Sequence, residues 1–212
     1  MPCKQDFEKM SALSERYRRA CAGEVQPGRT VLMLYVRGHG TSLIAADAAR
    51  KCGARNALFV AEKADCGMLR QALERAGTSV VMAPAKKDAG LELCREAMYL
   101  PGPVPSDLTV YLATPAHLAG IGHWHDAWPE KKPFGFVAVF GIDKYAKTRT
   151  EKGRGLAAAV NRAGSTLLLC EKEGLDPARI ESLAEEWGTL PCCPSVAPMA
   201  SSACEAMCMD TD

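Results

Sequence analysis

Six apolar runs recur along the chain, and helical patterns lie between most of them. The runs are apolar almost throughout rather than alternating with polar residues, which is typical of strands buried on both faces of a parallel sheet. They cover residues 30–36, 56–61, 79–83, 108–113, 135–141 and 165–170. Strands that alternate with helices of about 12 residues indicate right-handed β–α–β units. The sequence therefore predicts an α/β fold, a Rossmann-like, doubly wound, mostly parallel sheet of about six strands with helices on both faces.

Short polar residues and glycines mark where the helices should begin and end. Asp65 and Asp176 carry the carboxylate that an N-cap uses, and Pro177 follows at the first helical position. Four glycines follow predicted helices and suit left-handed C-caps: Gly53, Gly77, Gly164 and Gly188.

We expect the chain to have three parts. Residues 1–26 should form an N-terminal helix that packs on the domain, because apolar residues recur at helical spacing along one face of residues 5–22. Residues 27–190 should form the α/β domain, without a linker long enough for a second one. Residues 191–212 are predicted to be a flexible tail rich in Ser, Ala and Pro. The tail holds four cysteines whose spacing fits a zinc site only loosely: Cys192, Cys193, Cys204 and Cys208.

Composition narrows the class of protein. With 212 residues, of which 48% are hydrophobic, the chain can bury a sizeable core. A net charge of +1 gives no general attraction to nucleic acid or to an anionic membrane. No apolar run approaches the roughly 20 residues of a membrane helix. The first ten residues have mixed charge, unlike a secretory signal, so a soluble, cytoplasmic protein is expected. Most of the ten cysteines should then be reduced thiols that act as small hydrophobes.

The first strand runs into a glycine-containing turn, VRGHGTSL, at residues 36–43. In doubly wound folds ligands bind beyond the carboxyl ends of the strands, and a helix amino end attracts phosphate. Glu62 lies 22 residues beyond Gly40, where dinucleotide-binding proteins place a ribose-binding acid. Leu43 departs from the full glycine fingerprint, so a simple turn with a helix cap is the alternative, and His39 as a metal ligand is a lesser one. The predicted cofactor-binding residues are Gly38, His39, Gly40, Thr41, Ser42 and Glu62.

A basic segment follows the fifth strand, at residues 142–155. Lys144, Lys147 and Arg149 could clamp a phosphate or a carboxylate. Tyr145 offers a stacking surface, so nucleic acid is conceivable as a partner through residues 144–154 but is not favoured. The alternative is an ordinary solvated helix start.

Three of the four histidines lie in the segment 117–128, together with two tryptophans. His123, His125 and Asp126, with His117, could bind Zn²⁺. His117 or His123 could instead act as a general acid or base. The alternative is a loop whose tryptophans pack as a lid or an interface.

These patterns lead to three hypotheses. The first is an enzyme, preferably a transferase, that binds a nucleotide or another phosphorylated ligand at the carboxyl edge of the sheet, with His117, His123 or Asp143 as the acid or base. The second is a non-catalytic metabolite-binding or subunit-interaction domain, which would include a homo-oligomer. The third is a metal-dependent hydrolase centred on the histidine segment. No P-loop, nucleophile elbow, HExxH or C-x-x-C motif is present to decide among them.

Overall fold

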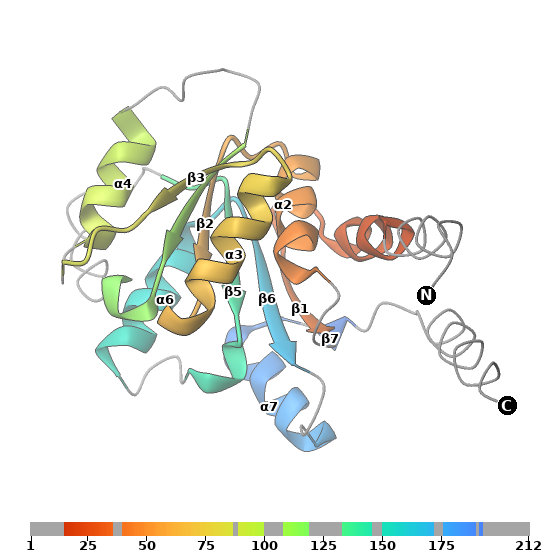
Figure 1. Cartoon of the computed structure of the whole chain (residues 1–212). Coiled ribbons are helices and arrows are strands. Elements are labelled where there is room, and N and C mark those ends of the chain that lie inside the picture. Colours follow the sequence, from red (N-terminus) through yellow and green to blue (C-terminus); the bar gives the residue numbers. More distant parts are fainter. Residues whose placement is uncertain are drawn as a thin grey trace, which may run out of the picture.

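Seven parallel strands form a single sheet in the computed structural model of the chain (Figure 1). The structure describes residues 15–35, 40–86, 89–99, 108–118, 133–145, 150–171, 176–189 and 191–192. The strand order is β3-β4-β2-β5-β6-β1-β7. The strands are β1 (Thr30–Tyr35), β2 (Asn56–Val60), β3 (Ser79–Met82), β4 (Thr109–Ala113), β5 (Phe136–Phe140), β6 (Ser165–Glu171) and β7 (Pro191–Cys192).

The six predicted strands are confirmed, with ends that differ from the prediction by one residue at most. Their apolar runs have the expected cause, because β4 and β5 are buried along their whole length and β6 along all but its last residue. The seventh strand was not predicted. Pro191 and Cys192 pair with Leu32 and Met33 of β1, so the expectation of a flexible tail does not hold for these two residues. Two residues carry no readable pattern, and proline is tolerated at the edge of a sheet because its missing N–H faces away from the ladder.

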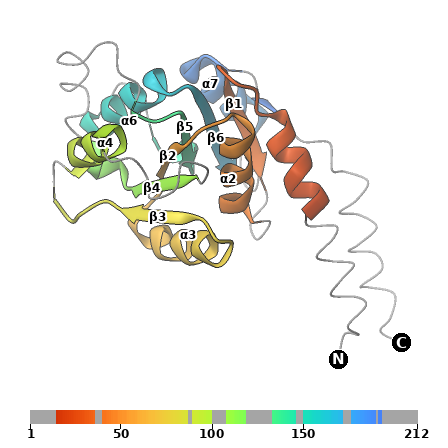
Figure 2. The same ribbon diagram turned by 90° about the horizontal axis from the view of Figure 1, so that it is seen from above.

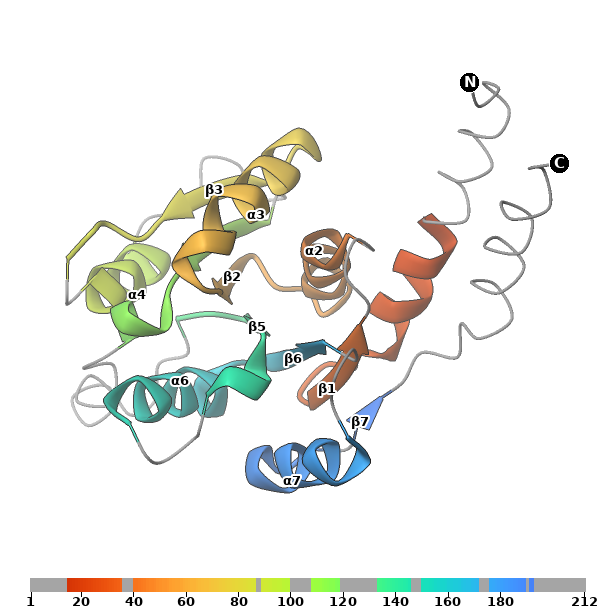
Figure 3. The same cartoon turned by 60° about the horizontal axis from the view of Figure 1, so that its bottom comes forward.

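Helices cover both faces of the sheet, which confirms the doubly wound α/β class (Figures 2 and 3). Residues 15–24, α2 (Thr41–Lys51) and α3 (Lys63–Arg75) pack on one face, where their apolar residues join Phe59 and Phe136. The other face carries α4 (Ala89–Tyr99), α6 (Glu151–Arg162) and α7 (Pro177–Trp187). Two short 3-10 helices follow β4 and β5: η1 (Pro115–Leu118) and η2 (Ile142–Lys144).

The connections between strands divide into two groups. From β1 through β2 to β3 the chain moves in one direction across the sheet, with α2 and α3 on one face. From β3 to β7 it moves back in the opposite direction, with α4, α6 and α7 on the other face. The direction of the chain across the sheet and the face that its helices cover change together. The crossovers through these helices therefore all have the same hand, as parallel β–α–β units require. The neighbouring strands β2 and β5 therefore lead to helices on opposite faces, and so do the neighbouring strands β6 and β1. In folds of this kind, ligands bind at the carboxyl ends of the strands at such points.

The N-terminal helix is described from residue 15 to residue 24. Cys21 and Val25 are fully buried against α2, and Arg18 forms an ion pair with Asp47 of α2 at 2.6 Å. Five cysteines are free thiols, and all of them except Cys52 are buried: Cys21, Cys52, Cys66, Cys94 and Cys170. No described helix combines the length and apolar character needed to cross a bilayer.

Helix ends agree with the predicted caps at most positions. Asp176 accepts a hydrogen bond from the Arg179 amide at 2.7 Å, with Pro177 in the first turn of α7. Asp65 is a correction: α3 begins earlier, at Lys63, with Glu62 at the N-cap, and Asp65 lies in the first turn. Three of the predicted C-cap glycines have the left-handed conformation: Gly53, Gly77 and Gly188.

Gly164 is the fourth predicted C-cap glycine, and its role differs from the prediction. It has no positive φ, and Ala163 is the C-cap of α6. A Cβ on Gly164 would lie 2.6 Å from the carbonyl oxygen of Gly135. The glycine therefore allows two backbone segments to approach each other where β5 and β6 begin.

Gly164→Ala is expected to destabilise the fold by roughly 1–3 kcal/mol, because relief of the contact with Gly135 must displace backbone. Gly23→Ala is the matched control, since the nearest atom to its Cβ is the flexible Lys51 Nζ at 4.0 Å. Urea unfolding followed by circular dichroism measures both. Equal stabilities for the two variants would contradict the assigned role of Gly164.

Candidate functional site

The carboxyl ends of β2 and β5 bring together residues from distant parts of the chain. Glu62 follows β2 and is the N-cap of α3, while Asp143 lies in η2 after β5 and Tyr145 ends that turn. All three side chains are partly exposed. Glu62 and Asp143 were predicted as site residues, and Tyr145 was predicted only as a stacking surface. Their convergence follows from the strand order, because β2 and β5 are neighbours in the sheet.

Glu62 and Tyr145 are joined directly. The Tyr145 hydroxyl donates a hydrogen bond of 2.6 Å to Oε1 of Glu62, across 83 residues of sequence. The pKa of Tyr145 is raised strongly, first because the phenol is half-buried and then because of Glu62 and the nearby charges of Asp65 and Asp143. Tyr145 is therefore a neutral hydrogen-bond donor at physiological pH, and it holds the Glu62 carboxylate in place at the edge of the sheet.

Asp143 is positioned by a turn that begins at Gly141. Gly141 has a left-handed conformation (φ 69°), and the chain then forms the single 3-10 turn that carries Asp143. Its Oδ1 lies 3.7 Å from the Cys170 Sγ of β6, and its backbone carbonyl accepts a hydrogen bond from Arg179 of α7 at 3.4 Å. Burial, followed by the charge of Asp143, raises the pKa of Cys170 to about 12. Cys170 is thus a protonated thiol that supports Asp143 rather than a nucleophile.

The amino end of α2 also reaches this edge of the sheet. Gly40, at the N-cap, has a left-handed conformation with φ 66° and ψ 41°. Among the described residues no side chain caps the helix, and its first turn contains no acidic residue. The alternative of a simple turn with a helix cap expects a side chain such as that of Thr41 or Ser42 to cap α2, and neither of these side chains does so. The first turn keeps the partial positive charge of a helix amino end without any carboxylate to neutralise it.

The strand order separates these two groups of residues. β1 and β2 are not neighbours, because β5 and β6 lie between them. Three strand spacings place the end of β1 about 14 Å from that of β2. Glu62 therefore does not stand beside the Gly40 turn as the acid of a dinucleotide fingerprint does, and its neighbour is Tyr145 instead. A ligand that contacts both Gly40 and Glu62 would have to lie across the ends of β5 and β6.

His117 lies in η1, beyond the end of β4. Its Nδ1 accepts a hydrogen bond from the Thr114 amide at 3.2 Å, which leaves the proton of the neutral ring on Nε2. Burial lowers the pKa of His117 and so favours the neutral ring. In this state His117 is a donor, and it is poorly suited to act as a general base.

Several predicted site residues lie outside the described residues: Gly38, His39, His123, His125, Asp126, Lys147 and Arg149. Lys144 is described and is exposed, with its aliphatic stem beside Gly141. Within the described ranges, no three His, Cys, Asp or Glu side chains are grouped so that they could hold a metal ion.

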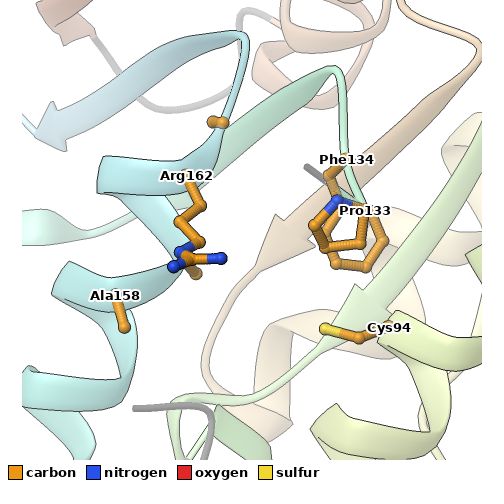
Figure 4. A pocket seen from close by; sticks show the side chains of 7 residues that line it. Cys94, Pro133, Phe134, Ala158 and Arg162 are labelled. Atoms are coloured by element: carbon orange, nitrogen blue, oxygen red, sulfur yellow. The ribbon is translucent and has the colours of Figure 1, made fainter. Parts of the chain in front are cut away.

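A small depression lies at the opposite, amino end of the strands (Figure 4). Phe134 and Pro133 precede β5, Arg162 comes from the end of α6, and Cys94 comes from α4. Its lining is mostly apolar, and it has room for about one water molecule. This depression is too small for a substrate and is separate from the carboxyl-edge residues.

Comparison with models of known protein families gives no match, and no curated protein matches the chain significantly.

Tyr145→Phe is expected to cost about 1 kcal/mol at neutral pH, because it removes the bond to Glu62. It should also change the response to alkali. Since the folded state raises the pKa of Tyr145, this group stabilises the fold below the ordinary tyrosine value of 10.0, and that stabilisation is lost as the pH rises above it.

The measurement is urea unfolding of wild type and Tyr145→Phe between about pH 8 and pH 11, which spans the ionisation of an ordinary tyrosine. The variant should lose less stability over this range than the wild type. Parallel curves with a constant difference would contradict the raised pKa.

Proposed function

We propose that the protein is an enzyme of transferase type that binds a nucleotide or another phosphorylated ligand across the carboxyl edge of its sheet. The observation that carries this proposal is the presence of two complementary groups on one edge. The amino end of α2 has no side-chain cap and no acid in its first turn, and the Glu62–Tyr145 pair stands on the other side of β5 and β6.

The phosphate would bind at the amino end of α2. Gly40 has no Cβ, and no atom of the described residues beyond its chain neighbours lies within 4 Å of the position a Cβ would take, so these residues leave the backbone open to a ligand there. The amides of Thr41 and Ser42 and the Thr41 hydroxyl would donate to phosphate oxygens, whereas the Leu43 amide already donates to the Gly40 carbonyl. Lys147 and Arg149 are proposed as a clamp for a second anionic group, together with Lys144.

The Glu62–Tyr145 pair would bind the hydroxyl-bearing part of the ligand. The Glu62 carboxylate accepts hydrogen bonds. Because the hydrogen bond from Tyr145 already fixes the orientation of this carboxylate, ligand binding does not have to order it at a further cost in entropy. A sugar diol has the donors that such a carboxylate requires. Phosphate at one end and sugar hydroxyls at the other together describe a nucleotide or a sugar phosphate.

Asp143 is the proposed general base, since it is a carboxylate between these two regions at the end of β5. It would accept the proton of an attacking hydroxyl group as the oxygen of that hydroxyl bonds to the transferred group. The bond between this group and the phosphorylated donor would break in the same step, and its electron pair would leave on the donor's phosphate oxygen. His117, as a neutral Nε2–H donor, would stabilise negative charge rather than remove a proton. Group transfer suits this arrangement because positioning and electrostatic stabilisation supply most of its catalysis.

Thr41→Glu separates phosphate binding from helix stability. A carboxylate in the first turn should stabilise α2 by about 0.3–1 kcal/mol and should repel a bound phosphate. Thr41→Gln is the matched control, with a side chain of the same size and no charge. We expect pyrophosphate and a panel of nucleoside mono- and diphosphates to stabilise the wild type and Thr41→Gln in thermal unfolding, and not Thr41→Glu.

A ligand at 100 times its dissociation constant should stabilise the fold by about 2.7 kcal/mol, which thermal unfolding resolves readily. Glu62→Gln should weaken nucleotides and leave pyrophosphate unaffected, because pyrophosphate has no hydroxyl groups for Glu62. The proposal fails if no phosphorylated compound stabilises the wild type, or if Thr41→Glu binds as the wild type does. Binding without turnover of any group donor would favour a non-catalytic metabolite-binding domain.

A further inference from the structure

The outer edge of β3 ends the sheet on the side opposite β7, and no described strand pairs with it. Its four residues, Ser79–Met82, contain neither a charge nor a proline. Natural proteins usually protect a sheet edge with lysine, proline or a bulge, because its free backbone groups can pair with another chain. Met82 is one of only two large hydrophobic side chains that are exposed in the described part of the protein. This edge therefore has the character of an interface.

The backbone groups that face outward along β3 form a short and well-defined set. The Ala83 amide bonds to Leu112 of β4, and alternate residues of a parallel strand point to the same neighbour. Val80 and Met82 therefore direct their N–H and C=O groups away from the sheet. The set is bounded on one side by Thr78, whose amide bonds to Leu73, and on the other by Pro84, which has no N–H.

Two such edges complement each other. In an antiparallel arrangement about a two-fold axis through Val81, Val80 of one chain stands opposite Met82 of the other. Each of these two pairs exchanges both of its backbone hydrogen bonds, so every outward group within the set is used. The edge is short, which would limit its pairing with a long strand of another protein. The same edge of a second copy has the same length.

The helix above this edge carries charges that fit the same symmetry. Along α3, Lys63, Gly67, Arg70 and Glu74 are exposed, at the spacing of one helical stripe. The half-buried Leu69 lies on the opposite side of α3 by helical spacing. Because α3 contacts α2, which lies on the same face of the sheet (Figure 3), we infer that this half-buried side is the one turned toward α2. The exposed stripe is thus on the side of the β3 edge.

Antiparallel packing of two α3 helices would place Lys63 opposite Glu74 of the second copy, twice over by symmetry. Glu74 already pairs with Arg70 of its own chain at 2.8 Å, so Lys63 would extend this pair into a network. Gly67, near the centre of the stripe, leaves room for close approach. The centre of the stripe lies about 10 Å before the end of α3. Val81 lies about 7 Å beyond the start of β3. Because these two distances from the connection between α3 and β3 are similar, one two-fold axis can pass through both elements.

We propose that the protein forms a two-fold symmetric homodimer through β3 and α3, in which the two sheets join edge to edge. A dimer of this kind requires the same patch on both copies to be self-complementary, and β3 and α3 meet that requirement independently. The proposed function does not depend on it, because the carboxyl-edge residues described above belong to the centre of the sheet.

Sedimentation of the full-length wild type over a range of concentrations tests the oligomeric state. We expect a reversible monomer–dimer equilibrium. Met82→Lys should raise the dimer dissociation constant at least about tenfold, a change of about 1.4 kcal/mol, because it places two lysines beside the joined edges. The Met82 side chain is exposed, so the variant should keep the circular dichroism spectrum and melting behaviour of a folded chain. A wild type that stays monomeric throughout would overturn the proposal.

A cysteine at the proposed axis tests the register. In antiparallel pairing the two Val81 residues form a non-hydrogen-bonded pair, with Cα atoms about 4.5 Å apart, which suits a disulfide. Mild oxidation of Val81→Cys should give a covalent dimer, and peptide mass spectrometry should find its disulfide between the two substituted positions. Ser79→Cys is the control, since residue 79 would stand opposite Ala83 of the second copy. Efficient self-linking at position 79 and not at 81 would rule out this register.

A charge exchange tests the helix contact. Glu74→Lys should weaken the dimer, and the double variant Glu74→Lys, Lys63→Glu should restore it, because the exchanged pair remains complementary across the axis. Glu181→Lys changes the net charge equally on exposed α7, far from β3, and should have no effect. A dimer that persists through both Met82→Lys and Glu74→Lys would use another surface and would refute the proposal.

Discussion

Each connection between parallel strands that follow one another along the chain must cross a face of the sheet with a right-handed turn, and the arrangement of this protein follows from that constraint. Because the chain moves from β1 to β3 in one direction, α2 and α3 must lie on one face. Because it then returns to β7, α4, α6 and α7 must lie on the other. The reversal makes β2 and β5 neighbours that lead to helices on opposite faces, and it also leaves β3 at an edge. The candidate site and the proposed dimer contact are both consequences of it.

The parallel arrangement also concentrates the polar chemistry. All carboxyl ends of the strands lie on one side, and so Glu62, Asp143 and Tyr145 meet although they come from separate units of the chain. At the amino side, the described residues form a small apolar depression beside Arg162. A half-buried carboxylate held by a neutral tyrosine is an arrangement that binds hydroxyl groups, while an uncapped helix amino end suits anions. The proposal of a phosphorylated ligand rests on the presence of both groups, one suited to hydroxyls and one suited to anions, at the same edge of the sheet.

The candidate site could be predicted from the sequence only in part. Glu62 and Asp143 were found because polar residues directly after buried strands lie at a ligand-binding edge. Their partners were not found, since Cys170 and Arg179 belong to elements whose neighbours depend on strand order. Glu62 was expected beside Gly40 by analogy with a fold in which the first two strands are adjacent. Here two strands intervene, and its neighbour is Tyr145.

By itself, the sequence determined what depends on residues close together in the chain. The six longer strands, the cap at Asp176 and the left-handed turns at Gly53, Gly77 and Gly188 follow from local periodicity and local backbone preference. Only the tertiary structure decided which strands are neighbours, why Gly164 must lack a side chain beside Gly135, and where the sheet ends at Pro191 and Cys192. The physical reason is that strands buried on both faces have nearly the same apolar pattern. Their order is therefore set by the packing of helices and strands across the whole domain.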